Sequence, residues 1–153
     1  TMPNTPAAIG KGATVAVANA ACTAAHKALA DTALNGTGLV EWITDESLMN
    51  AVTALSGSGP AYVFYLIEAL KKAGADIGLP PALAAALARQ TVIGAAALAE
   101  TDAQTSPATL RQNVTSPGGT TAAALETLMN GEFQDILTRA LGAAKKRGEE
   151  LAG

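Results

Sequence analysis

The chain has 153 residues, enough for one domain with a core of its own, and it carries a net charge of −3 with a pI of about 5.0. This acidic balance argues against a nucleic-acid partner, which would require a basic face. Apolar residues make up 49% of the chain and charged residues only 15%, so we expect apolar surface to be covered by another chain. With one cysteine, Cys22, and one histidine, His26, the chain cannot form an internal disulfide, and we expect neither a metal site nor a Ser-His-Asp triad.

The first 44 residues predict a β-α-β fragment. Met2–Pro6 has two prolines three positions apart, which predict an extended segment and exclude a helix. A short strand is expected at Ala13–Ala18, a helix at Cys22–Leu34, and a second strand at Gly38–Ile43 after a Gly-rich turn. Two strands are too few for a stable sheet, so this part is expected to be the end of a larger α/β domain.

From Asp45 onward the sequence predicts only helices. Asp45 is a suitable N-cap for a helix that ends at about Leu55, and Gly57–Pro60 then interrupts it. The next helix, Ala61–Ala73, has Gly74 as its expected stop. Its first two turns are apolar on every face, which predicts that this helix is buried on all sides.

Four further helices are expected in the second half of the chain, where prolines, hydroxyls or glycines mark their starts. They cover about Pro80–Thr101, Ser106–Asn113 and Thr120–Met129, and the last runs from Gly131 or Glu132 to Leu151. The most membrane-like stretch is Ala82–Ala99, but Arg89 in its middle would cost about 2.5–3.5 kcal/mol in a bilayer. No signal peptide is evident at the N-terminus. We therefore expect a cytoplasmic protein with no membrane partner.

The loop Ser116–Thr121, with the sequence Ser-Pro-Gly-Gly-Thr-Thr, is the clearest candidate for a binding site. Its glycines let the backbone approach a ligand closely, and the free N–H groups of the helix start that follows favour an anion. The hydroxyls of Ser116, Thr120 and Thr121 add hydrogen-bonding groups. A small carboxylate suits this loop better than a dinucleotide, because the chain has neither a Gly-x-Gly-x-x-Gly fingerprint nor a Walker lysine. An ordinary capped turn explains the same residues equally well.

Two other segments are weaker signals by themselves. Leu55–Tyr62 also places small residues and hydroxyls at a helix start, but its glycines are better explained by close packing of helices. Asn4 offers an amide for directional hydrogen bonds within an extended segment. Taken together, however, the blocks Met2–Pro6, Ala54–Tyr62 and Val114–Thr121 occur in the order and at the spacing of pyrroline-5-carboxylate reductases. The chain resembles that family over essentially its whole length.

The resemblance implies an enzyme that reduces 1-pyrroline-5-carboxylate to L-proline with NADPH or NADH, the last step of proline biosynthesis. It also implies a mainly α fold. Residues 1–44 would be the end of a Rossmann domain. Residues 45–153 would be an all-helical dimerisation and substrate-binding domain, similar to the C-terminal domain of 6-phosphogluconate dehydrogenase. Interlocking helices would form a homodimer or a higher homo-oligomer.

The resemblance also assigns residues to the two ligands. The substrate carboxylate would be bound by Ser116, Gly118, Gly119, Thr120 and Thr121. Thr121 would be the catalytic residue, placed beside the ring nitrogen. The nicotinamide of NADP(H) or NAD(H) would lie near Met2, Pro3, Asn4, Thr5 and Asn113. A protonated pyrroline needs orientation more than a strong general acid, which suits a site without a titratable pair.

Most of the cofactor site, including its Gly-rich loop, would precede Thr1. We therefore expect this chain alone neither to bind NADPH tightly nor to turn over substrate. Two other interpretations stay open. One is an oligomerisation module with no chemical role. The other is an enzyme of the related β-hydroxyacid dehydrogenase type, which would need an acid-base group that Arg89 cannot provide at neutral pH.

Overall fold

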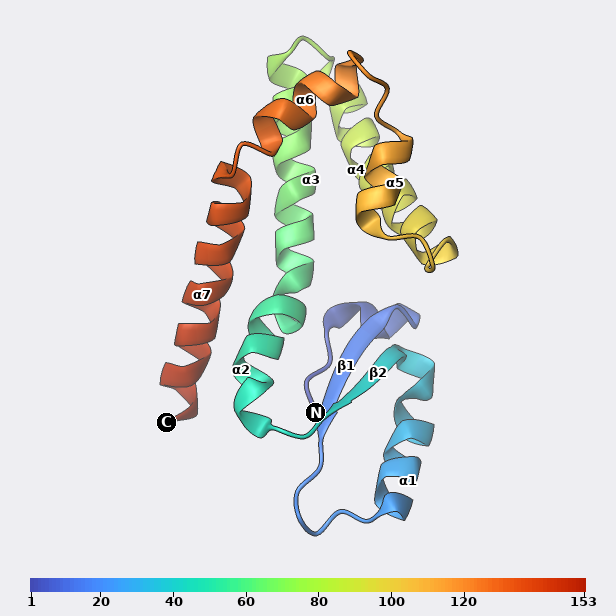
Figure 1. The fold of residues 1–153 in the computed structure, drawn as a ribbon, viewed down its shortest axis with the longest axis vertical. Helices are drawn as coiled ribbons and strands as arrows, with labels where there is room; N and C mark the ends of the chain where they lie inside the picture. Colours follow the sequence, from blue (N-terminus) through green and yellow to red (C-terminus); the bar gives the residue numbers. More distant parts are fainter. The chain divides into compact units, whose positions relative to one another are not determined.

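The computed structural model describes every residue from Thr1 to Gly153 and is mainly helical, with one small parallel sheet (Figure 1). It divides into two compact units. Unit 1 comprises Thr1–Val63 and Leu137–Gly153, and unit 2 comprises Phe64–Ile136. The mainly α fold with an N-terminal β-α-β piece is therefore confirmed. The domain boundary expected between residues 44 and 45 stays a prediction.

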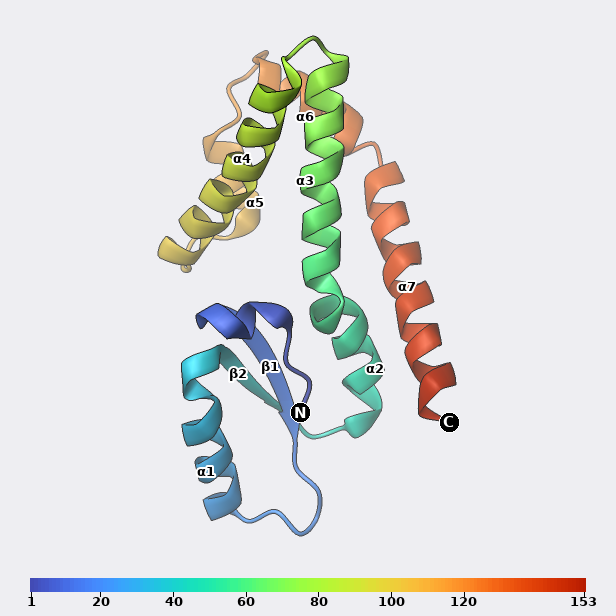
Figure 2. The ribbon, with the colours of Figure 1, turned by 180° about the vertical axis from the view of Figure 1, so that it is seen from behind.

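The β-α-β piece belongs to unit 1. Strands β1 (Gly12–Val17) and β2 (Gly38–Ile43) pair in parallel, with Gly12 opposite Gly38 and Val17 opposite Ile43. Helix α1 (Ala24–Leu34) forms the crossover and lies beside the two strands (Figures 1 and 2). The 3-10 turn η2 (Asn35–Thr37) leads from α1 into β2. The Gly12–Gly38 pair is close, because a Cβ on Gly38 would lie only 2.2 Å from the Gly12 carbonyl oxygen.

Helix α1 begins two residues later than the predicted start at Cys22. Thr23 has an extended backbone, and its hydroxyl accepts a hydrogen bond of 3.3 Å from the N–H of His26. In return, Nδ1 of His26 accepts a 3.3 Å bond from the N–H of Thr23. This reciprocal capping places the helix start after Thr23 and gives the only histidine a local structural role.

The N-terminal segment Met2–Thr5 is extended only in part. Met2 forms an antiparallel bridge with Val15 of β1, through bonds of 2.8 and 3.1 Å. The 3-10 helix η1 (Thr5–Ile9) follows, so the prediction that the two prolines exclude a helix was wrong beyond Asn4. Pro6 suits the first turn of η1, because the N–H that proline lacks would have no partner there and the φ of proline, near −65°, is already helical.

The single helix predicted from Asp45 to Leu55 is in fact three short turns of different pitch. The 3-10 turn η3 (Glu46–Leu48) is capped by Asp45, whose carboxylate accepts a 2.9 Å bond from the N–H of Ser47. Helix α2 (Met49–Val52) then widens into the π-helical turn η4 (Thr53–Gly57). The predicted interruption after it is confirmed at Ser58.

Helix α3 (Gly59–Asp76) is longer than predicted, and the expected stop at Gly74 was wrong. The absence of a side chain at Gly74 allows close packing instead, since a Cβ on Gly74 would lie 3.3 Å from Cβ of Ala84 on the next helix. The chain turns only at Gly78, whose φ of 104° favours glycine. Helix α4 (Pro81–Thr101) follows, one residue after the predicted start at Pro80 and with the predicted end.

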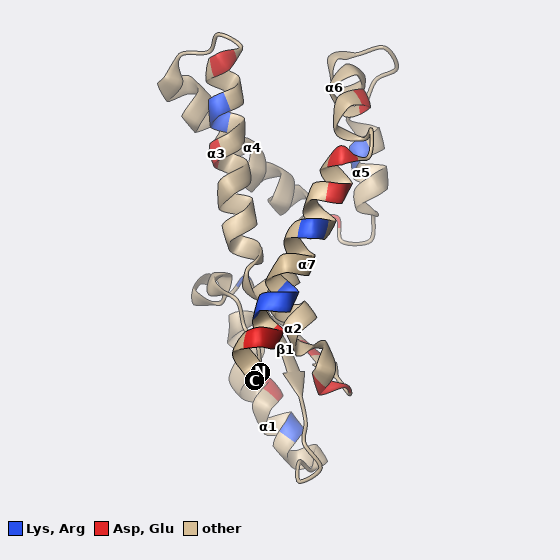
Figure 3. Ribbon diagram, turned by 90° about the vertical axis from the view of Figure 1, so that its left-hand side faces the viewer, with Lys and Arg blue, Asp and Glu red and all other residues tan.

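Three helices complete the chain: α5 (Pro107–Asn113), α6 (Thr120–Leu128) and α7 (Glu132–Ala152). Their predicted starts are confirmed, and two ends differ from prediction by one residue. Helix α5 runs beside α4 in both ribbon views (Figures 1 and 2). Charged residues follow one another along α7 in groups, with acidic residues at both ends and basic residues between them (Figure 3), and Lys145 and Glu149 form an exposed ion pair of 3.4 Å. Helix α7 is therefore the most strongly charged long helix of the chain.

The helices leave much of their apolar surface uncovered within one chain. Four small residues, Ala16, Ala54, Ala84 and Ala88, are the only buried hydrophobic ones. Phe64 is 59% exposed, although the sequence predicts that the start of α3 is buried on all sides. Helix α4 is long and apolar enough to span a membrane by length and composition alone, which a helix covered by another protein chain also satisfies. The apolar surface predicted to need a cover is therefore present.

Candidate functional site

The loop between α5 and α6 has the tight backbone that its sequence predicts. Helix α5 is capped by Ser106, whose hydroxyl accepts a 3.1 Å bond from the N–H of Thr109. After α5, the N–H of Gly119 donates a 3.0 Å bond to the carbonyl oxygen of Ser116, which closes a turn over Pro117 and Gly118. Gly118 has a φ of 68°, and proline followed by a positive-φ glycine is typical of a type II turn.

Helix α6 begins directly at this turn. Its N-cap residue, Gly119, has no side chain to cap the helix, and a Cβ at that position would lie 3.1 Å from the Ser116 carbonyl oxygen. The N–H groups of the first turn of α6 are thus left for a ligand or water. Ser116 and Thr120 are exposed and Thr121 is half-buried, and none of their hydroxyls has a partner inside the chain. This arrangement can bind a small anion through backbone N–H and hydroxyl groups.

Asn113 lies at the end of α5 and is exposed. Its amide has no partner within the chain. The next residues stay fixed to the helix, because the Thr115 hydroxyl donates a 2.6 Å bond to the carbonyl oxygen of Arg111. Asn113 therefore lies at the start of a loop in which its own amide is unpaired and the bond from Thr115 to Arg111 fixes the backbone.

In unit 1, the N-terminal segment Met2–Thr5 contacts η4. The Oδ1 atom of Asn4 accepts a 2.9 Å bond from the N–H of Ala13 on β1. Its Nδ2 donates bonds of 3.3 and 3.2 Å to the carbonyl oxygen and the hydroxyl of Ser56. Met2 lies against the same turn, since a Cβ on Gly57 would be 3.3 Å from the Met2 sulfur. The first two motifs of the sequence therefore meet in space, 52 residues apart along the chain.

The pitch of η4 explains why side chains bind its carbonyl groups. The N–H of Ser58 donates a 2.8 Å bond to the carbonyl oxygen of Thr53, five residues back, rather than to that of Ala54. The freed Ala54 oxygen accepts a 3.0 Å bond from the hydroxyl of Tyr62. Tyr62 thus replaces the helical donor that the Ala54 oxygen has lost, and it is the first of two side-chain donors to carbonyl groups of η4.

The second donor was not predicted. The carbonyl oxygen of Ser56 would normally accept a bond from the residue four positions later, but that residue is Pro60, which has no N–H. The amide of Asn4 supplies the missing bond. The signal was present as a proline four residues after Ser56, but the partner could not be identified from a segment so distant in the sequence.

The structure places the candidate residues in both units. Met2–Thr5 lie in unit 1, whereas Asn113 and the loop Ser116–Thr121 lie in unit 2. Each set is brought together locally. The assignment of one set to the cofactor and the other to the substrate stays a prediction.

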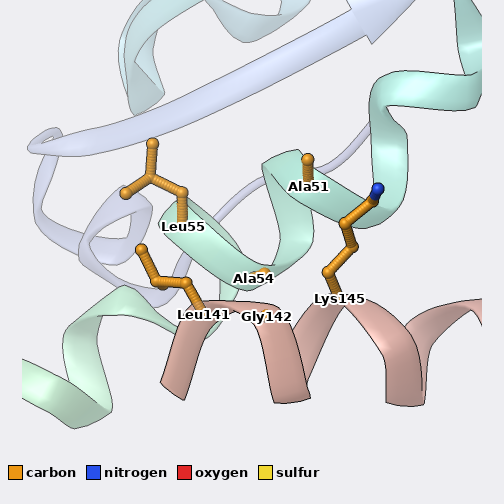
Figure 4. Close-up of a pocket in the computed structure, with 6 residues that line it drawn as sticks. All are labelled: Ala51, Ala54, Leu55, Leu141, Gly142 and Lys145. Atoms are coloured by element: carbon orange, nitrogen blue, oxygen red, sulfur yellow. The ribbon is translucent and has the colours of Figure 1, made fainter. Parts of the chain in front are cut away.

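An apolar groove of about 280 Å³ lies in unit 1 between the α2–η4 segment and α7 (Figure 4). Its lining consists of Ala51, Ala54, Leu55, Leu141, Gly142 and Lys145. Only Lys145 brings a charge, and it is already paired with Glu149. This groove is therefore a gap between packed helices with no polar group positioned for chemistry.

Titratable groups contribute little to either candidate site. No cluster of three or more His, Cys, Asp or Glu residues could hold a metal ion. Cys22 and His26 are exposed near the start of α1. The clearest shift is at Asp45, where the hydroxyl and N–H of Ser47 lower the pKa of the carboxyl below its ordinary 3.8.

Comparison with known proteins gives one consistent family. The family model described as pyrroline-5-carboxylate reductase dimerisation matches residues 46–151. The pyrroline-5-carboxylate reductase of Pseudomonas aeruginosa is 44% identical over 151 residues, which are 99% of this chain and 55% of that protein. The enzyme of Pisum sativum is also 44% identical over 151 residues, with the same coverage of both chains. The chain thus spans about half the length of these curated relatives.

Solved structures agree with the sequence relatives. A pyrroline-5-carboxylate reductase from Coxiella burnetii superposes with a TM-score of 0.91 at 43% identity, over 98% of this chain and 55% of that one. The pyrroline carboxylate reductase of Plasmodium falciparum, solved with NADP bound, gives a TM-score of 0.84 at 32% identity. That match covers 99% of this chain and 62% of the other. The similarity therefore extends through the β-α-β piece as well as the helices.

Proposed function

Since the chain belongs to the pyrroline-5-carboxylate reductase family by its dimerisation domain, we propose that it is the C-terminal part of an enzyme that reduces 1-pyrroline-5-carboxylate to L-proline. The observation that carries this proposal is the superposition on the Coxiella burnetii reductase over nearly the whole chain, at 43% identity. Helices and β-α-β piece match together, so the resemblance is not confined to a common helical fold.

The loop Ser116–Thr121 is our proposed substrate site. The uncapped start of α6 supplies backbone N–H groups for the carboxylate, and Gly118 and Gly119 leave room for it. The hydroxyls of Ser116 and Thr120 add hydrogen bonds. Thr121 is half-buried with a free hydroxyl, so it can bind the ring nitrogen and stabilise the amine that forms. In the proposed reaction these groups orient a protonated pyrroline and need not supply a strong acid.

A bound nicotinamide cofactor would supply the hydride that is added to C5 of the pyrroline ring. We propose that Met2, Pro3, Asn4, Thr5 and Asn113 lie near the nicotinamide. The amide of Asn4 is engaged within the chain, so Asn4 would contribute through its backbone, while the free amide of Asn113 can contact a ligand directly. The NADP-bound relative supports a phosphorylated dinucleotide as the cofactor, with NADH as the other possibility.

We further propose a cytoplasmic homodimer or a higher homo-oligomer. The exposed apolar residues of α3 and α4 support this, since they give a second copy a large surface to cover. The matched family model describes dimerisation. A second copy would also account for the apolar character of α4 without a membrane.

The function is tested with the full-length polypeptide that contains this chain, by following NADPH oxidation with 1-pyrroline-5-carboxylate. Thr121→Ala should lower kcat by about ten-fold or more, because it removes the hydroxyl beside the ring nitrogen. Thr101→Ala is the matched control. Its hydroxyl bonds only to the carbonyl of Ala97 in its own helix, so activity should be retained. Unchanged turnover in Thr121→Ala would mean that the loop is structural and would favour a pure oligomerisation module.

The isolated 153-residue chain provides a second test. We expect no micromolar binding of NADPH in a fluorescence titration and no turnover, because most of the cofactor site would lie outside it. Micromolar binding by this chain would contradict that part of the proposal.

A further inference from the structure

The amide of Asn4 holds three segments of unit 1 together. Its oxygen accepts a bond from Ala13 on β1, and its nitrogen donates to the backbone and the side chain of Ser56 in η4. The orientation of the amide is unambiguous, because a backbone N–H can only face Oδ1 and a carbonyl oxygen can only face Nδ2. Both polar atoms of the amide are therefore engaged inside the chain.

The need for this contact comes from Pro60. Without an N–H at position 60, the carbonyl oxygen of Ser56 has no helical donor. Ser56 is half-buried, and a carbonyl oxygen without a partner in such a place is costly, which makes it a directional acceptor for a donor from elsewhere in the fold. Asn4 is that donor, so the Ser56 carbonyl oxygen, which has no helical donor, helps to hold Met2–Thr5 in place.

We propose that Asn4 is a positioning residue for hydride transfer. Through Ala13 and Ser56 it fixes the N-terminal segment Met2–Thr5, which the proposed function places at the nicotinamide. This inference rests on that proposed function. Hydride transfer is sensitive to small misplacements of the reacting atoms. Loosening this segment should therefore slow the chemical step more than it weakens ligand binding.

The test uses the full-length enzyme and Asn4→Asp. The carboxylate keeps an acceptor for the N–H of Ala13, loses both donors to Ser56, and sets a negative charge against the Ser56 carbonyl oxygen. We expect the single-turnover rate of NADPH oxidation to fall by about ten-fold to a hundred-fold. The Kd for NADPH should change by less than about three-fold, because the amide itself does not bind the cofactor. Asn19→Ala is the matched control, since that amide accepts one bond in an exposed turn.

A second pair of variants separates positioning from folding. Asn4→Ala should lower the Tm, because Ser56 loses its donor and the N–H of Ala13 loses its acceptor. Adding Pro60→Ala restores an N–H four residues after Ser56, so the double variant should regain the part of the thermal stability that was lost at Ser56, while the N–H of Ala13 stays without its acceptor. It should not regain the hydride-transfer rate, because Met2–Thr5 is then held only by the bridge between Met2 and Val15 and has lost its bonds to Ala13 and Ser56. Ser56→Ala removes only the hydroxyl acceptor and should lower the rate by no more than about three-fold.

The outcomes distinguish the two proposals. If the unmodified full-length enzyme does not oxidise NADPH with 1-pyrroline-5-carboxylate, the proposed function fails. If it does, and Asn4→Asp keeps the single-turnover rate, the positioning role is wrong. It is also wrong if the double variant recovers rate and stability together, since Asn4 would then act only by holding the fold.

Discussion

The hydroxyl of Tyr62 donates a 3.0 Å hydrogen bond to the carbonyl oxygen of Ala54, which has lost its α-helical donor to the wider turn of η4. Ala54 is only 3% exposed, so water cannot readily replace the phenol. Tyr62→Phe should therefore lower the free energy of unfolding by about 1–3 kcal/mol. Chemical denaturation of the chain measures this. Tyr65→Phe, at a 71% exposed tyrosine three residues later, is the control and should change little.

Two glycines of α7 should respond differently to alanine. Nothing lies within 4 Å of a Cβ built on Gly142, so Gly142→Ala should raise stability by up to about 1 kcal/mol through helix propensity. A Cβ on Gly148 would lie 2.8 Å from Oδ1 of Asn50 on α2, so Gly148→Ala should gain less or lose stability. Thermal unfolding compares the two variants. Equal gains would contradict the close approach of α7 to α2.

The exposed face of α4 offers a direct test of self-association. Leu83 and Leu87 lie one helical turn apart and are 45% and 48% exposed in the single chain. If a second copy covers them, Leu83→Glu with Leu87→Glu removes about 1.5–3 kcal/mol of burial for each leucine and adds buried charge. Light scattering should then show a shift from dimer to monomer. Gln104→Glu, which adds one charge in the exposed connection after α4, should leave the dimer intact. A monomeric unmodified chain would contradict the proposed assembly.

Asp45 gives a pH dependence of known sign. The hydrogen bonds from Ser47 lower the pKa of its carboxyl in the folded chain below 3.8. Its contribution to stability is therefore present above the unfolded pKa and is lost as the pH falls through the folded one. An NMR titration should place the midpoint of Asp45 below 3.8. Asp45→Asn keeps an acceptor for Ser47 without titrating, so its stability should fall less steeply in acid. A midpoint at or above 3.8 would contradict the capping geometry.

Local signals explain which elements could be predicted. Strand β2 has its predicted bounds, helix α4 begins one residue after its predicted start, and Ser106 with Pro107 marked the start of α5 correctly. The stop expected at Gly74 was wrong because that glycine is used to bring Ala84 close. A glycine signals either a turn or a close approach, and only the tertiary contact decides between them.

The candidate site also has one part that could be predicted from nearby residues and one part that could not. The turn over Pro117 and Gly118 follows from adjacent residues and was predictable, although its ligand stays a prediction. The π-helical turn η4 was not predictable from its own residues, which were expected to continue a helix from Asp45 to about Leu55. Asn4 is 52 positions from Ser56, and no pattern of nearby residues could identify that pair.

That same separation has a consequence for how the chain folds. Closing a loop of 52 residues costs about 3.5 kcal/mol of chain entropy, more than the few hydrogen bonds of one amide return. The contact between Asn4 and Ser56 is therefore expected to form late, after β1 and the helical turns exist to offset that cost. A bond made after the folding barrier slows unfolding without speeding folding. In this chain, the amide of Asn4 is then a determinant of how long the native state persists.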